Sequence, residues 1–230
     1  MRLASSTTAA ILAGCVAGVD GHGPLALVSS SPEDGETWPA NAPLVLRFDR
    51  YLATVPSTSP DVTLVSGEVV VPIGLLYDPV ERAVVVAHPD ELTPGVGYVL
   101  TFAPDALRGL DGGRLDGPLS LGFVATAGGL EPVAPAPDFE ADIRPLFAHR
   151  CGCHGPPPLV WPELSPDSLL DVPGRRSWPL SLVSPGAPLR SGLVRKILPG
   201  YPGVAGAPMP PEGPLSTREL RLIVDWVRDL

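Results

Sequence analysis

Residues 92–102 read Leu-Thr-Pro-Gly-Val-Gly-Tyr-Val-Leu-Thr-Phe, and this stretch holds the signals that decide the fold of the first half of the chain. Thr93-Pro94-Gly95 is a turn cluster, because proline presets φ and glycine reaches backbone conformations that other residues avoid. The run from Tyr98 to Phe102 is short and apolar, which is typical of a β-strand bounded by turn signals. A turn followed by a short apolar strand is therefore the expected pattern.

Short apolar runs of the same kind recur on both sides of this stretch. The seven predicted strands are Leu25–Val28, Leu44–Phe48, Val62–Val65, Val69–Ile73, Ala83–Ala87, Tyr98–Phe102 and Leu119–Val124. Turn clusters such as Asp111-Gly112-Gly113 separate them. This spacing predicts an antiparallel sandwich, although the alternation is too loose to separate a sandwich from a barrel by periodicity alone.

The turn motifs of residues 26–126 resemble those of bacterial Ig-like domains of the surface-layer type. The matching motifs are Pro32-x-Asp34-Gly35, Phe48-Asp49, Leu92-x-Pro94-Gly95-x-x-Tyr98, Asp111-x-Gly113 and Phe123-x-x-Thr126. The resemblance implies an all-β Ig-like sandwich in which the Tyr98 hydroxyl bonds back to the preceding loop. The aspartates of these turns are expected to be solvated, with calcium binding as the alternative. No catalytic constellation is visible, so we expect this domain to be a spacer.

Composition excludes one class of partner. The chain has 230 residues and a net charge of −9, and only 18% of its residues are charged. An acidic chain without a basic stripe argues against nucleic-acid binding. The 31 prolines predict long loops, whereas 44% hydrophobic residues predict two folded domains rather than disorder.

The N-terminus is typical of an exported lipoprotein. Leu12-Ala13-Gly14-Cys15 follows an apolar run too short to span a bilayer and resembles a lipobox, in which the cysteine is acylated. Residues 1–15 are therefore predicted to be a lipoprotein signal peptide and lipobox, and residues 16–25 a tether. The alternative is an ordinary signal peptide with an incidental Cys15. We expect an anchor in the cell membrane or outer membrane, facing the periplasm or the exterior.

Residues 127–137 are Pro-rich and predict a semi-rigid linker before a last segment of different character, residues 138–230. Helical spacing predicts a helix from Asp138 that Pro145 kinks or splits, a second from about Pro188 to Leu198, and a third after the capping box Ser216-x-x-Glu219. Such a small core often needs a staple or a cofactor.

Cys151-Gly152-Cys153-His154 is one residue short of the haem-attachment signature Cys-x-x-Cys-His. A disulfide between the two cysteines is the simpler interpretation for an exported protein, but it would close a strained ring. Met209 is the only methionine besides Met1, and its Pro-rich loop is suited to presenting the sulfur to a metal.

The segment resembles a small all-α c-type cytochrome. The matching motifs are Asp142-Ile143-Arg144-Pro145-Leu146, Cys153-His154-Gly155, Pro185-Gly186-x-Pro188-x-x-Ser191, Met209-Pro210-Pro211-x-Gly213 and Leu215-Ser216 leading to Trp226-Val227. The resemblance implies one haem c with His154 and Met209 as axial ligands, attached through cysteine. Arg150 stands where the first cysteine of the full motif belongs, so Cys153 is the better attachment site and Cys151 the weaker one.

The predicted lipobox and the two resemblances lead to two possible functions from different classes. The first is a membrane-anchored electron-transfer lipoprotein, not an enzyme, that binds haem and passes electrons to a redox partner protein. The alternative is a non-redox surface structural or interaction lipoprotein that has lost haem. A zinc site built from Cys151, Cys153, His154 and His149 is a third possibility, but these residues lie too close together in sequence for a comfortable tetrahedron.

Overall fold

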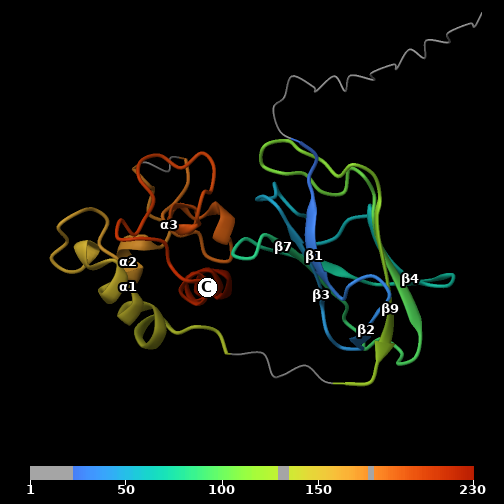
Figure 1. The fold of residues 1–230 in the computed structure, drawn as a ribbon. Helices are drawn as coiled ribbons and strands as arrows, with labels where there is room; N and C mark the ends of the chain where they lie inside the picture. The colour runs from blue at the N-terminus through green and yellow to red at the C-terminus, as the bar shows by residue number, and fades with distance from the viewer. Residues whose placement is uncertain (1–22, 129–134, 176–178) are drawn as a thin grey trace, which may run out of the picture.

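The computed structural model describes residues 23–128, 135–175 and 179–230. They form two lobes, a β-sandwich and a C-terminal unit of short helices and loops (Figure 1). The predicted signal peptide with Cys15, most of the tether and the middle of the linker lie outside the described residues, and those assignments stay predictions.

The described part of the first lobe contains nine strands in two sheets. One sheet has the order β1-β3-β7-β6, formed by Leu27–Ser31, Leu44–Phe48, Ala83–Ala87 and Gly74–Asp78. The other has the order β2-β9-β8-β4-β5, formed by Glu36–Pro39, Leu119–Thr126, Gly97–Phe102, Val62–Ser66 and Val69–Val71. Every pair is antiparallel except β2 with β9. The predicted Ig-like sandwich is confirmed, and β2 and β6 are strands that the apolar runs did not reveal.

The core of the sandwich lies between the sheets. Leu44, Leu46 and Phe48 of β3 are buried at alternate positions, as are Leu100 and Phe102 of β8. Burying a large apolar side chain contributes about 1.5–3 kcal/mol, so these alternating positions hold the two sheets face to face.

Tyr98 closes the turn before β8, as the resemblance to Ig-like domains implied. Its hydroxyl accepts a hydrogen bond from the backbone N–H of Thr93 at 2.9 Å, and its ring stacks on Phe123. Gly95 has φ +81°, a conformation that favours glycine, so the Pro94-Gly95 turn needs this residue. The corner prediction for Tyr98 is confirmed.

The C-terminal unit has its own core. Its helical elements are η1 (Phe139–Ile143), α1 (Arg144–Arg150), η2 (Gly152–His154), α2 (Pro166–Leu169), η3 (Pro188–Arg190), α3 (Gly192–Ile197) and α4 (Thr217–Asp229). Ile143, Val183, Val194 and Ile223 are fully buried at its centre. The capping box is confirmed, because the Ser216 N–H donates to the Glu219 carboxylate and the Glu219 N–H donates to the Ser216 hydroxyl.

The predicted fold class was wrong for this unit, which is not an all-α cytochrome c-like domain. Of its described helices, α4 has 13 residues, α1 has seven and each of the others has six or fewer. Isolated β-bridges, including Leu170 with Val183, hold the intervening loops. The reason is the proline content, because proline lacks an N–H and clashes with the preceding turn, so Pro-rich stretches cannot extend helices.

The described residues contain no helix that is both long and apolar enough to cross a membrane.

Candidate functional site

The segment that carries the predicted ligands is a tight turn at the end of α1. The Cys151 N–H donates to the Phe147 carbonyl, and the His154 N–H donates to the Cys151 carbonyl, both at 2.8 Å. The chain therefore leaves the α-helix at Cys151 and continues through the 3₁₀ turn η2. Cys151 and Cys153 are consequently not on one regular helical face.

The two thiols have different surroundings. Both cysteines are free, with Cys151 half-buried and Cys153 exposed. Burial raises the pKa of the Cys151 thiol to about 11. Because the thiolate is both the nucleophile and the metal ligand, Cys151 is the less reactive of the two at neutral pH.

His154 and Met209 are held by different parts of the unit. The His154 Nδ1 lies 2.8 Å from the Pro162 carbonyl oxygen, so the neutral ring carries its hydrogen on Nδ1. The Met209 N–H lies 3.5 Å from the Lys196 carbonyl oxygen, which ties its loop to α3. Both residues are half-buried.

Arg150 has a structural role that the spacing of the haem motif did not predict. Its guanidinium forms an ion pair with Glu219 at 3.1 Å and donates to the carbonyl oxygens of Gly213 and Pro214. These bonds connect the end of α1 with the first turn of α4 and with the loop before it. The position that would carry the first haem cysteine instead carries a structural cross-link.

The residues present do not fit a haem, and the predicted cofactor was wrong. The cavity beside Cys151 measures about 80 Å³, and neither His154 nor Met209 lines it. Ligand pockets usually measure about 300–1,000 Å³. The space between η1, α1 and α4 is filled by Phe139, Phe147 and Trp226, whose ring centroids lie 5.4–6.4 Å apart.

The alternative metal sites find no support either. Within the described ranges, no group of three or more His, Cys, Asp or Glu side chains could hold a metal ion. This applies to zinc at Cys151, Cys153, His154 and His149, and to calcium at the aspartate turns.

The two lobes meet in a specific interface. Tyr51, from the loop after β3, belongs to the buried core of the C-terminal unit; its hydroxyl donates to the Pro199 carbonyl at 2.8 Å. Its ring lies 4.9 Å from that of Tyr201. The tip of the β6–β7 hairpin reaches α4 (Figure 1), where Arg221 pairs with Asp78 at 2.9 Å and with Glu81 at 3.3 Å.

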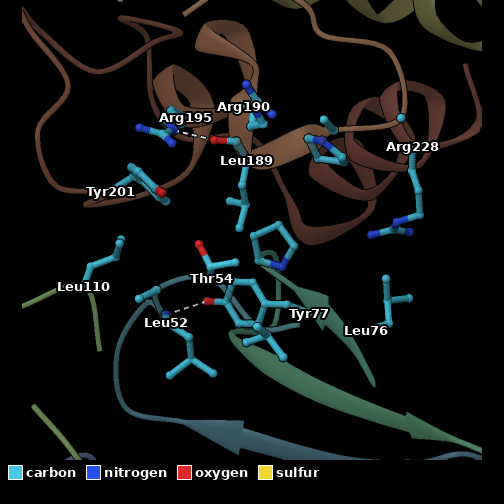
Figure 2. Close-up of a pocket in the computed structure, with 16 residues that line it drawn as sticks. Leu52, Thr54, Leu76, Tyr77, Leu110, Leu189, Arg190, Arg195, Tyr201 and Arg228 are labelled. Atoms are coloured by element: carbon cyan, nitrogen blue, oxygen red, sulfur yellow. Dashed lines mark hydrogen bonds between the residues drawn. The ribbon is translucent and has the colours of Figure 1, made fainter. Parts of the chain in front are cut away.

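A cleft of about 330 Å³ opens beside this interface (Figure 2). The sandwich contributes Leu52–Val55, Leu76, Tyr77, Pro79 and Leu110, and the C-terminal unit contributes Gly186–Arg190, Arg195, Tyr201 and Arg228. Its walls are mainly apolar, and its charged lining residues are all arginines. Local sequence patterns do not reveal this site, because its two walls are more than 70 residues apart along the chain.

No known family model matches the chain, and no curated protein matches it. Among solved structures, it is similar to the bacterial S-layer protein SbsC, with 11% identity over 52% of this chain and 15% of that one and a TM-score of 0.36. It is also similar to CopC from Methylosinus trichosporium OB3b, with 18% identity over 46% of this chain and 97% of that one and a TM-score of 0.35. A third similar structure is PcoC, a copper resistance protein from Escherichia coli, with 17% identity over 44% of this chain and 99% of that one and a TM-score of 0.36.

The chain thus spans only 15% of the length of the surface-layer protein. At these TM-scores, the likenesses carry no argument about function. The sandwich assignment rests on the strand pairing of the chain itself.

Proposed function

We propose that this chain is an exported, lipid-anchored structural or interaction protein that does no redox chemistry and catalyses no reaction. Cys15 is the lipidated residue, and the membrane is the partner that the anchor engages. The sandwich and the C-terminal unit form one platform above that anchor.

The observation that carries the proposal is the interface at Tyr51. A side chain of the sandwich completes the core of the C-terminal unit, and two carboxylates of the β6–β7 hairpin hold Arg221 of α4. The proposal requires the two units to keep a fixed relative position, which the buried Tyr51 contact and the ion pairs of Arg221 favour.

Fractionation of cells tests the anchor. The wild-type protein is expected in the membrane fraction, whereas Cys15→Ser is expected in the soluble exported fraction, because acyl chains supply the membrane affinity. Cys153→Ser is the matched control and is expected to stay with the membrane. A membrane-bound Cys15→Ser variant, or a soluble wild-type protein, contradicts lipid anchoring.

A visible spectrum tests the absence of redox chemistry. The protein purified from cells with intact cytochrome maturation is expected to show no Soret band. A Soret band at stoichiometric intensity contradicts the proposal.

A further inference from the structure

We propose that the cleft between the two lobes binds a small amphipathic carboxylate, an anion with an apolar body of about ten carbons. This inference does not depend on lipid anchoring. It rests on the shape, the lining and the charge of the cleft.

The cleft has the size and surface of a small-molecule site. Its volume of about 330 Å³ lies at the lower end of the range for ligand pockets, so it suits a small ligand rather than a protein segment. Leu52 and Tyr77 on the sandwich side face Leu189 of the C-terminal unit (Figure 2). An apolar chain between them would remove both walls from water.

The charge of the lining points to an anion. The whole chain has 25 acidic and 16 basic residues, yet no Asp or Glu lines the cleft, whereas Arg190, Arg195 and Arg228 do. Arg228 is paired with Asp225. In the described part of the chain, no carboxylate lies within ion-pair distance of Arg190 or Arg195, although acidic side chains outnumber basic ones.

Arg195 is fixed in place before any ligand binds. Its Nε donates to the Leu189 carbonyl, and its guanidinium lies 5.4 Å from the centre of the Tyr201 ring. Within the part of the chain that the structure describes, its other guanidinium N–H groups have no hydrogen-bond acceptor. A planar guanidinium matches a carboxylate in geometry, and a preorganised one loses less side-chain entropy on binding.

Tyr201 offers a hydroxyl group to a ligand in the cleft. Only 9% of this residue is exposed, and it lines the cleft, yet among the described residues its hydroxyl has no hydrogen-bond partner. The neighbouring Tyr51 and Tyr77 hydroxyls are both bonded to backbone groups, at 2.8 Å and 3.0 Å. The Tyr201 oxygen is not among the buried unsatisfied atoms, so it is open to the cleft, where a ligand would replace water as its partner.

Isothermal titration calorimetry with decanoate tests the proposal, using the full chain with Cys15→Ser so that no detergent competes for the cleft. Saturable 1:1 binding of decanoate is expected, with 1-decanol bound at least about tenfold more weakly because it lacks the charge that the arginines recognise. The double variant Arg190→Gln/Arg195→Gln is expected to weaken decanoate binding at least about tenfold. Arg218→Gln, which changes an exposed arginine away from the cleft, is the matched control and should bind as the parent does.

A second variant separates the cleft from other apolar surfaces. Thr54 is exposed at the rim, so Thr54→Trp fills the cleft without removing a buried group. It is expected to abolish decanoate binding while its thermal unfolding stays unchanged. The proposal is overturned if decanoate shows no saturable binding, if decanol binds equally well, or if either cleft variant binds decanoate as the control does.

Discussion

The Arg150 guanidinium lies 3.1 Å from the Glu219 carboxylate and joins the end of α1 to the capping box of α4. The Glu219 carboxylate thereby accepts hydrogen bonds from the N–H and the hydroxyl of Ser216 inside the box and from the arginine outside it. The Arg150 side chain thus connects two helices with the loop at Gly213 and Pro214.

Replacing Arg150 tests this cross-link. Arg150→Gln removes the ion pair and weakens the bonds to two carbonyl oxygens, so it is expected to lower the free energy of unfolding by about 1–2 kcal/mol. Urea denaturation measures the loss. Arg218→Gln on the exposed face of α4 should stay within about 0.5 kcal/mol of the parent. Equal stability of the two variants would show that the pair contributes nothing.

Restoring the cysteine spacing tests the conclusion about haem. Arg150→Cys creates the full Cys-x-x-Cys-His pattern ending at His154. We expect no Soret band from this variant, even with cytochrome maturation, because the cavity beside Cys151 measures only about 80 Å³ and neither His154 nor Met209 lines it. A haem-containing Arg150→Cys variant would show that the missing cysteine, and not the size of the cavity, excludes the cofactor.

Acid is expected to destabilise the protein through paired carboxylates. The pKa of Glu219 is lowered chiefly by the hydrogen bond from the Ser216 backbone, and the pKa of Glu81 chiefly by the Arg47 side chain. A carboxylate whose folded pKa is lowered stabilises the fold above its unfolded pKa of about 4.3, and this contribution is lost as pH falls through the folded pKa.

The urea midpoint measured from pH 7 to pH 3 should therefore fall steeply below about pH 4.5. Glu219→Gln keeps the capping geometry but removes the titrating group, so its fall should be shallower. Glu33→Gln, at an exposed turn, should follow the parent. Parallel curves for all three proteins would contradict the assignment to Glu219.

Tyr51 is expected to control whether the two lobes unfold together. Tyr51→Phe removes the hydrogen bond to Pro199 and should reduce stability by about 1 kcal/mol in a single transition. Tyr51→Ala also removes the ring from the core of the C-terminal unit and should cost about 3 kcal/mol or more. Differential scanning calorimetry should then resolve two transitions. One unchanged transition for Tyr51→Ala would show that this contact does not couple the lobes.

Thiol chemistry should distinguish Cys153 from Cys151. With a pKa of about 11, roughly one in a thousand Cys151 side chains is a thiolate at pH 8. Cys153 is exposed and should react with a disulfide reagent at least about tenfold faster. Stopped-flow labelling of Cys151→Ser and Cys153→Ser variants, each with Cys15→Ser, gives the two rates. Equal rates would contradict the burial of Cys151.

Local sequence signals correctly predicted features that lie within a single strand, turn or helix end. The apolar runs predicted β3 and β7 with their observed bounds, Leu44–Phe48 and Ala83–Ala87. They missed β2, which has four residues, a proline and only one large apolar side chain, and β6, which has only three apolar side chains between Gly74 and Asp78. The turn before Tyr98 and the Ser216 capping box were also predicted correctly, because each needs only residues within five positions of one another.

The cytochrome expectation failed because matching motifs in the right order say nothing about how long the intervening helices are. The prolines between Cys153 and Met209 keep the helices short, and Phe139, Phe147 and Trp226 form the core between η1, α1 and α4. Which side chains fill that core is settled only when η1 and α1 pack on α4.

The sequence alone therefore determined most of the strands, the turn before Tyr98 and the start of α4, because apolar runs, turns and caps are local, whereas the sandwich and the Tyr98 corner were expected from the resemblance to Ig-like domains. Tertiary structure decided the rest. The Tyr51 contact with Pro199 joins residues 148 positions apart, and the Arg150–Glu219 pair joins residues 69 apart. The hydrophobic periodicity of a single element cannot predict contacts between residues so far apart in the sequence. The cleft at the interface forms only when both lobes pack together.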